Sequence, residues 1–435
     1  MTWTLRFNIL DDCPAAPKSV DNAVSATVLR TVTVTAASAT SLQKAFSDAT
    51  FGDDIVLPID TYSGNFSLPA PAGSSGSSPY NFVTVRSQSL SSLPASGVRV
   101  ATTDAVNMPI VRTTNDSAVI AVSTSASFYR FQGIEFAATK VDTTTTLVNL
   151  VSIDASATTL SQVPSNFIFD RCYIHGTSTG NIRRGLSFQV ANGTVVDSYI
   201  SECHEIGADS QALACWNGPG PFLIQNNELQ GSAENVLFGG ADPGITDLVP
   251  SDITIRGNHF FKPLTWYVND PSYAGIDWVI KNSFELKNAS RVLFIGNIIE
   301  NCWADAQVGF AVLLTPRNQN GGAAWSVVRD VTIKHNILRN SASGVNLQNT
   351  DDLSTSLAVS CVRIQHNLFD NINRVVFGGN GRLFQLLDGG ESLTAQRVTI
   401  DHNTCLHVNG GNSFATVGDQ GTVINDFTWT NNLMT

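Results

Sequence analysis

The chain has 435 residues, of which 43% are hydrophobic, so it is long enough to bury a large core. Only 14% of its residues are charged, and the net charge is −11, which argues against nucleic acid or an anionic membrane surface as the main partner. No apolar run is long enough to span a membrane, and a local basic cluster can still bind an anionic substrate.

The first 30 residues predict an extension that precedes the folded repeat, and they lack the features of a secretory signal. Residues 41–49, SLQKAFSDA, read as a short amphipathic helix with Leu42 and Phe46 on one face. Because the strand DIVLP follows directly, we expect this helix to cap the first coil of a solenoid that occupies residues 31–435.

A short pattern of two alternating apolar residues, two variable residues and an asparagine recurs along the chain. It ends at Asn227, Asn258, Asn297, Asn336, Asn367, Asn403 and Asn432, and related strands upstream place Ile134, Cys172 and Tyr199 at the same position. The spacing is irregular, which is typical of a solenoid whose loops absorb insertions around a fixed short core.

Each repeat carries three short strands with alternating apolar residues. After Asn258, for example, HFFKP is followed by FELKN at 284–288 and RVLFI at 291–295. We therefore predict an all-β fold, a right-handed three-faced parallel β-helix with a short N-terminal capping helix. At each bend the asparagine can satisfy the turn backbone and bond the asparagine about 4.8 Å away in the next coil.

The end of the chain and its cysteines give two further expectations. The last residues, FTWTNNLMT, stop in the middle of a repeat, so we expect the coils to continue beyond Thr435. The seven cysteines form no CxxC motif, and the sequence therefore gives no support to a zinc ribbon or a thioredoxin-type site. We expect the cysteines to be small buried apolar residues.

Together these features resemble the pectate-lyase-like superfamily of right-handed parallel β-helices. The resemblance rests on the capping helix, the stretch GDDIVLPIDTYSGNFSLP and the asparagine-marked coils, and it covers residues 30–435. The stretches YRFQGIEF, HEIGADSQALACWNGPGPF, ENVLFGGADP and KNASRVLFIGNIIENCW are similar to bacterial secreted β-helix proteins of unassigned activity. The resemblance implies an extracellular or cell-surface location, and a ligand site on the strand face that follows the longest loops. Since the superfamily includes lyases, hydrolases, epimerases, adhesins and phage tailspikes, the fold alone does not give the activity.

Alternation predicts which side chains leave the core on that face. If Phe284 and Leu286 in the strand FELK point inward, Glu285 and Lys287 point outward. The same rule exposes a column of amides and one aromatic ring, which suits sugar binding: Gln189, Trp216, Asn235, Asn346, Gln348 and Gln385.

Glu285, Lys287 and Arg317 form the charged centre of this column and are the predicted catalytic residues. Acidic polysaccharides are cut by β-elimination, in which a carboxylate is neutralised, the proton next to it is removed and the glycosidic oxygen leaves. Neutralisation needs a cation, and proton removal needs a base whose pKa has been lowered by positive charge and burial. The arrangement is similar to that of alginate- and chondroitin-cleaving β-helix lyases, where a lysine in an E…K…N strand precedes an arginine one coil later. The family has His-Gly after that arginine, whereas this chain reads TPRNQNGG.

The same resemblance implies calcium as a cofactor. The family's calcium-binding acids are represented here by Glu285 and Glu234. The alternative interpretation is a plain ion pair between Glu285 and Lys287 on a solvated strand.

A second cluster contains His204, Glu205 and Asp209. Carboxylates beside a histidine suit the acid–base chemistry of glycoside hydrolases, but the same residues also suit a polar loop around the coil.

Two aromatic features remain open. His335, His366 and His402 each precede a ladder asparagine, so they should stack as a column that either is structural or binds a metal. The aromatic insertion at 261–283 either roofs a sugar-binding groove or covers an apolar patch.

The sequence favours an extracellular β-helix that binds a polysaccharide or cell-surface glycan and cleaves an acidic glycan at Lys287 and Arg317. A non-catalytic solenoid, such as an adhesin or a phage-tailspike-like protein, is the alternative hypothesis. Exposed amides, low charge and many Ser and Thr residues suit both, and formation of an unsaturated sugar product would separate them.

Overall fold

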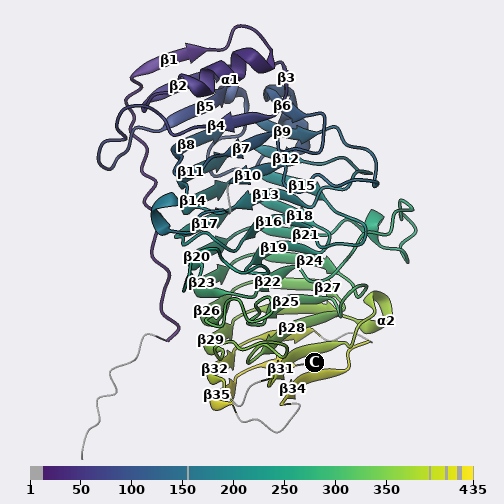
Figure 1. The fold of residues 1–435 in the computed structure, drawn as a ribbon. Helices are drawn as coiled ribbons and strands as arrows, with labels where there is room; N and C mark the ends of the chain where they lie inside the picture. The colour runs from purple at the N-terminus through teal and green to yellow at the C-terminus, as the bar shows by residue number, and fades with distance from the viewer. Residues whose placement is uncertain (1–12, 154–155, 391–392, 407–409, 419–423, 435) are drawn as a thin grey trace, which may run out of the picture.

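The computed structural model describes residues 13–153, 156–390, 393–406, 410–418 and 424–434. Three parallel sheets wind around one apolar core and form a three-faced parallel β-helix, as the repeat predicts (Figure 1). Each coil passes through the three sheets in turn, so strands about three apart in the chain are neighbours in space.

The first sheet contains the strands that lead into the asparagine bend. They are β1 (Arg30–Thr33), β2 (Asp53–Leu57), β5 (Val83–Ser87), β8 (Ser127–Gln132), β11 (Ser165–Asp170), β14 (Ala191–Val196), β17 (Phe222–Gln225), β20 (Ser251–Arg256), β23 (Ala289–Ile295), β26 (Val328–Lys334), β29 (Ser360–Gln365), β32 (Gln396–Asp401) and β35 (Asn425–Thr430).

The second sheet follows that bend. Its strands are β3 (Thr61–Ser63), β6 (Ile110–Thr113), β9 (Glu135–Ala138), β12 (Tyr173–His175), β15 (Tyr199–Cys203), β18 (Glu228–Gly231), β21 (His259–Phe261), β24 (Ile298–Cys302), β27 (Ile337–Ser341), β30 (Leu368–Ile372), β33 (Thr404–Leu406) and β36 (Leu433–Met434).

The third sheet carries the predicted ligand face. It consists of β4 (Phe66–Leu68), β7 (Ile120–Val122), β10 (Val151–Ile153), β13 (Arg184–Phe188), β16 (Gln211–Cys215), β19 (Glu234–Phe238), β22 (Phe284–Leu286), β25 (Phe310–Leu314), β28 (Ser343–Gln348), β31 (Arg382–Leu387) and β34 (Ser413–Val417).

Helices are few and short. The predicted capping helix is α1 (Ala39–Ser47), which starts after Ser38, whose hydroxyl accepts a hydrogen bond from the Ser41 N–H at 3.1 Å. Its residues Leu42 and Phe46 are buried in the core of the first coils. The other helices are α2 (Arg374–Phe377) and the 3₁₀ turns Leu90–Ser92, Thr102–Asn107, Leu160–Gln162 and Leu264–Trp266. None of the helices in the described part of the chain is long and apolar enough to cross a membrane.

Asparagine side chains form a ladder between the first and second sheets. The Asn258 Oδ1 accepts hydrogen bonds from the backbone N–H and the Nδ2 of Asn227, at 2.9 and 3.0 Å. The Nδ2 of Asn258 also donates to the Ile224 carbonyl at 2.9 Å. The same pattern continues through Asn297, Asn336, Asn367, Asn403 and Asn432. These bonds pair polar groups that the bend buries, and they fix the register of one coil on the next.

The upstream end of the ladder is displaced by one residue from our prediction. Ser198, and not Tyr199, stands at the ladder position, because its hydroxyl accepts from the Cys172 N–H at 3.0 Å. Its own N–H donates to Asn227 Oδ1 at 2.9 Å, and its hydroxyl donates to the Val196 carbonyl at 2.8 Å. The serine thus accepts the same bond from the preceding coil as an asparagine does, but it donates within its own coil, and a search for asparagine misses it.

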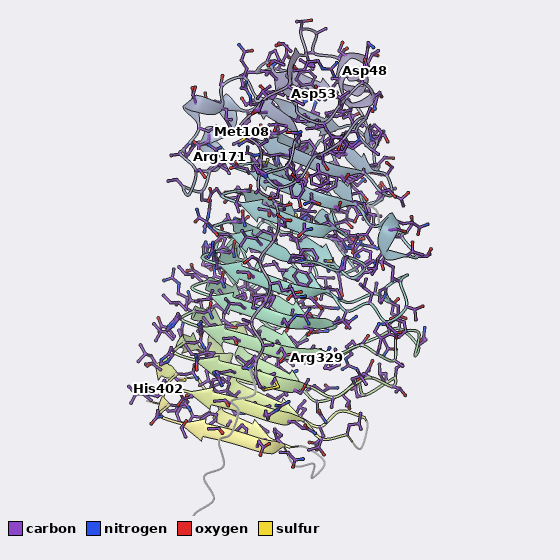
Figure 2. All side chains as sticks on the ribbon, turned by 90° about the vertical axis from the view of Figure 1, so that its left-hand side faces the viewer. Asp48, Asp53, Met108, Arg171, Arg329 and His402 are labelled. Carbon is purple, nitrogen blue, oxygen red and sulfur yellow. A yellow bond between two sulfur atoms is a disulfide. The ribbon has the colours of Figure 1, made fainter. Side chains whose placement is uncertain are left out.

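The N-terminal extension is a strap that follows the first sheet for most of the solenoid, and residues 1–12 lie outside the described part. In Figure 1 it descends along the left side of the coils, the side that Figure 2 faces. The Ala15 N–H donates to Asp330 at 3.1 Å, and the Lys18 N–H donates to Asp252 at 2.9 Å. Both aspartates have a left-handed backbone, with φ of 54° and 61°. Two coils that are separated by one other coil therefore offer aspartate acceptors to the same extended segment.

A disulfide joins Cys13 in the strap to Cys361 in β29. Our expectation that the cysteines are buried thiols is therefore wrong for this pair, because a separation of 348 residues gives no signal in a spacing pattern. The other cysteines are buried, as we expected: Cys172, Cys203, Cys215, Cys302 and Cys405.

The ladder predicts a difference between two substitutions of Asn297. Asn297→Ala leaves the Asn258 N–H and the Ile255 carbonyl without partners, so we expect a loss of about 2–5 kcal/mol in the free energy of unfolding. Asn297→Ser restores a hydroxyl of the kind seen at Ser198 and should cost clearly less. Urea unfolding measures both, and equal losses for the two variants would contradict this role of the ladder.

The strap predicts a redox-dependent stability. Cys13→Ser frees the end of the strap, and we expect the unfolding free energy to fall by roughly 3–5 kcal/mol. Dithiothreitol should lower the denaturant midpoint of the native protein to that of the variant and leave the variant unchanged. A native protein whose midpoint does not respond to reductant would show that the strap does not hold the coils.

Candidate functional site

A cavity of about 530 Å³ opens on the third sheet, where β22, β25, β28 and β31 lie side by side. The register places Glu285, Leu313, Asn346 and Gln385 at equivalent positions of successive coils. Six of the residues predicted from the sequence line this cavity: Glu285, Lys287, Arg317, Asn346, Gln348 and Gln385.

Lys287 and Glu285 form an ion pair at the cavity wall. The Lys287 Nζ lies 3.0 Å from Glu285 Oε1; the Glu285 side chain is fully buried and that of Lys287 is 18% exposed. The charge of Glu285 raises the pKa of Lys287 well above its usual value, against the opposing effect of burial. Lys287 is therefore a firmly protonated cation, and it lacks the lowered pKa that we expected of the base in an elimination.

A second carboxyl group lies behind this pair. Glu234 is fully buried, and its Oε2 accepts a hydrogen bond from Gln211 Nε2 at 2.8 Å. Burial, followed by the charge of Glu285, raises the pKa of Glu234 to about 8. Burial acts the same way on Glu285, but Lys287 and a hydrogen bond from Glu234 together hold the pKa of Glu285 below its usual value. At neutral pH the two carboxyls thus share one proton, which resides on Glu234.

Arg317 lies beside Lys287, as expected, because its N–H donates to the Lys287 carbonyl at 2.9 Å. Its guanidinium binds two carboxylates, with Nη1 2.9 Å from Asp351 Oδ1 and also in contact with Asp352. Asp351 is buried and further accepts from the Asn318 N–H at 3.0 Å, whereas the Asp352 side chain is 50% exposed. We did not predict this acid pair from the sequence, although the DD dipeptide follows the outer strand one coil beyond the arginine.

The amides on the far side of the cavity are ordered by one another and by the backbone. Gln385 Nε2 donates to Asn346 Oδ1 at 2.9 Å, and Gln348 Nε2 donates to the Thr350 carbonyl at 2.8 Å. All three are nearly buried, so they present only their edges to a ligand.

Two predicted sugar-binding amides do not face the cavity. Gln189 is buried, and its Oε1 accepts from the N–H groups of Trp216 and Asn217 at 2.9 and 2.8 Å. Asn235 is also buried and donates to the carbonyls of Leu229 and Phe261 in the second sheet.

Both amides hydrogen bond to backbone groups near bends of the chain. A buried carbonyl or N–H group needs such a hydrogen-bond partner. In β19 the outward position belongs to Glu234, so the strict alternation that we assumed fails at the start of that strand.

Trp216 lies on the third sheet outside the cavity lining. Its ring is half-buried, and the guanidinium carbon of Arg184 lies 5.0 Å from the ring centroid.

In the structure, the three residues of the second predicted cluster each contact a different partner. Glu205 Oε2 binds Arg183 Nε at 2.7 Å, and Asp209 binds Lys281 Nζ at 2.6 Å. His204 is fully buried and binds Glu202 at 3.0 Å. The three side chains have separate partners because each belongs to a different contact of the loops around the coil.

The aromatic insertion covers an apolar patch, the second of the two interpretations offered by the sequence. Trp266, Tyr267 and Trp278 pack in one buried cluster with Ile280 and Trp303. The ring of His204 stacks on Trp278 with centroids 3.8 Å apart, which explains the burial of that histidine.

The three predicted column histidines stack on the exposed side of the bend. The ring centroids of His335 and His366 are 5.2 Å apart, and those of His366 and His402 are 5.1 Å apart; Figure 2 labels His402 near the C-terminal coils. The first pair is stacked and the second tilted, and among the described residues these histidines form no group that could hold a metal ion, which favours the structural interpretation.

Calcium does not fit the residues for which it was predicted. Glu234 and Glu285 share a proton, and the Lys287 ammonium already supplies the positive charge beside them. Nowhere in the described ranges do three or more His, Cys, Asp or Glu side chains gather in an arrangement that could hold a metal ion.

Comparison with known proteins gives structural relatives only. No family model matches the chain, and no curated protein matches its sequence. A mannuronic acid specific polysaccharide family 6 lyase from human gut microbiota is similar over 94% of this chain and 82% of its own, at 12% identity and a TM-score of 0.50. Pectate lyase Pel9A is similar over 94% and 81%, at 13% identity and a TM-score of 0.43. The A-module of mannuronan C-5 epimerase AlgE6 from Azotobacter vinelandii is similar over 91% and 95%, at 12% identity and a TM-score of 0.41.

The shared proton predicts how stability depends on pH. Because the folded pKa of Glu234 lies above its unfolded value, the folded state binds more protons between about pH 5 and 8. The unfolding free energy should therefore fall as pH rises through this window, with a slope of up to about 1.4 kcal/mol per pH unit from this group. Glu234→Gln imitates the protonated form and should remove that part of the slope in urea unfolding.

Glu202→Gln is the matched control, because Glu202 is a partly exposed carboxylate away from the pair. An unchanged slope in Glu234→Gln would contradict the shared proton.

Proposed function

We propose that this chain, a parallel β-helix of the pectate-lyase-like type, acts outside the cell on an acidic polysaccharide, which it binds along the third sheet and cleaves by β-elimination. One observation carries the proposal: two cations on neighbouring coils, Lys287 and Arg317, line the same cavity. Both can reach one sugar, which is what neutralising a uronate carboxylate requires.

The chemistry assigns a role to each charged residue. Arg317 binds the carboxylate of the sugar when it exchanges Asp352, the more exposed of its two partners, for the substrate. Neutralisation of the carboxylate acidifies the neighbouring C–H, and Asp352, released at the cavity wall, accepts that proton. A carbon–carbon double bond forms as the glycosidic C–O bond breaks, and the Lys287 ammonium protonates the leaving oxygen. Glu285 is a positioning residue that keeps Lys287 charged.

The amides of the cavity support the proposed sugar binding, and the disulfide supports the proposed location. Asn346, Gln348 and Gln385 supply edges that suit sugar hydroxyls, and Trp216 offers an aromatic surface farther along the sheet. The Cys13–Cys361 disulfide is typical of proteins in oxidising compartments, which supports an extracellular or cell-surface location. Since the matched family 6 lyase is mannuronic acid specific, alginate is the first polymer to test.

A second candidate function is a solenoid that binds a glycan without cleaving it, as an adhesin or a tailspike-like protein does. One observation supports this alternative. Each of the two cations already has a carboxylate partner, so a sugar carboxylate must compete with Glu285 and Asp351 for them.

Activity on alginate, pectate and glycosaminoglycans separates the two candidates. We expect an unsaturated, ultraviolet-absorbing product from at least one of these polymers, and a fall in rate of about 100-fold or more in Lys287→Ala and in Arg317→Ala. Arg329→Ala, on the exposed face of β26 in the first sheet, is the matched control and should keep full activity.

Circular dichroism and thermal unfolding verify that each variant is folded. If no polymer yields the product, yet one of them retards the protein in affinity gels, the non-catalytic function is the correct one.

A further inference from the structure

Arg184 is a cation on the ligand face that the proposed reaction does not use. It is the first residue of β13 and pairs in register with Gln211 of β16, which pairs with Glu234 of β19. Its Nε donates to Gln211 Oε1 at 3.1 Å, and its Nη1 donates to Asn149 Oδ1 at 3.3 Å. Both partners are neutral amides, and no ion pair within the described residues involves Arg184.

The cations nearest to Arg184 and those of the cavity have carboxylate partners instead. Arg183 binds Glu205 at 2.7 Å, and Lys287 and Arg317 each contact a carboxylate. Burial, together with repulsion from Arg183, lowers the pKa of Arg184 to about 10. A half-buried guanidinium that has lost water and has no carboxylate in direct contact among the described residues is costly to the free protein, and an anionic ligand offsets that cost.

Trp216 holds the guanidinium in place. The ring lies 5.0 Å from the guanidinium carbon, a cation–π contact that fixes the plane of the group. The Nη2 group has no hydrogen-bond partner in the described ranges and the residue is partly exposed, so it is available to a ligand. The ring edge of Trp216, also half-buried, lies beside it as an apolar surface.

A row of polar side chains connects Arg184 to the cavity. Arg184 donates to Gln211, Gln211 donates to Glu234 at 2.8 Å, and Glu234 lies close enough to Glu285, the partner of Lys287, for the charge of Glu285 to raise its pKa. The strands β13, β16, β19 and β22 are consecutive in the third sheet, so Arg184 lies three coils from the cavity, about 14 Å along the axis.

We infer that Arg184, positioned by Trp216, Gln211 and Asn149, is a second subsite that binds a sugar carboxylate of the same polymer chain that enters the cavity. The inference rests on the proposed function, since it takes an acidic glycan to lie along the third sheet. A sugar ring is about as long as one coil is tall, so a chain must be several sugars long to reach both positions. The subsite therefore selects long acidic chains and leaves short ones unaffected.

Binding of oligomannuronates of two lengths tests the inference, with isothermal titration calorimetry as the measurement. For the hexasaccharide we expect Arg184→Gln to raise the dissociation constant about tenfold, because it removes one charge-assisted contact. The disaccharide should bind the variant and the native protein alike. Arg329→Gln, which removes an arginine from the first sheet, should change neither, and Trp216→Phe should weaken hexasaccharide binding less than Arg184→Gln does.

The outcomes distinguish this inference from the proposed function. Equal hexasaccharide affinity in Arg184→Gln and the native protein, with cleavage intact, overturns the subsite and leaves the lyase activity standing. Loss of hexasaccharide affinity in Arg184→Gln without any cleavage supports the subsite and overturns the lyase activity. A native protein that binds no oligomannuronate, oligogalacturonate or heparin hexasaccharide overturns both.

Discussion

The backbone hydrogen bonding of one coil to the next is the constraint on which every other feature depends. Each strand pairs in parallel with its equivalent in the following coil. Side chains at equivalent positions of successive coils therefore form a column along the axis. The ladder from Asn227 to Asn432 fixes that register, and the strap with its Cys13–Cys361 disulfide ties distant coils together. A loop of any length can be inserted between strands without disturbing the columns.

On the proposed ligand face of the third sheet, the cations differ in how many acidic partners they have. Lys287 has one ionised carboxylate beside it and one protonated carboxyl behind it, and Arg317 has two aspartates. Under the proposed function, a substrate carboxylate would compete with resident acids in the cavity, whereas at Arg184 it would meet a cation whose hydrogen-bond partners are amides. Under the two proposals, Arg184 increases the affinity for long polysaccharide chains, and cleavage takes place at Lys287.

The fold was predictable from the sequence because its signal repeats. Seven asparagines and an alternating apolar pattern give the coil, the sheets and the outward position of Glu285 and Lys287. Strict alternation failed where a side chain had to satisfy buried backbone groups, as at Asn235 and Gln189. The asparagine pattern failed where a serine takes the ladder position, at Ser198. The contact of Asp351 and Asp352 with Arg317 joins two neighbouring coils, and the Cys13–Cys361 disulfide joins the strap to a distant coil. No local sequence pattern predicts such contacts.

The most direct test of the account is a structure of the protein with a bound acidic hexasaccharide. We expect the sugar chain to run along the third sheet, parallel to the solenoid axis, with one carboxylate at Lys287 and Arg317 and another at Arg184. A sugar chain bound to the histidine column or to the first sheet, with this cavity free of it, would contradict the account.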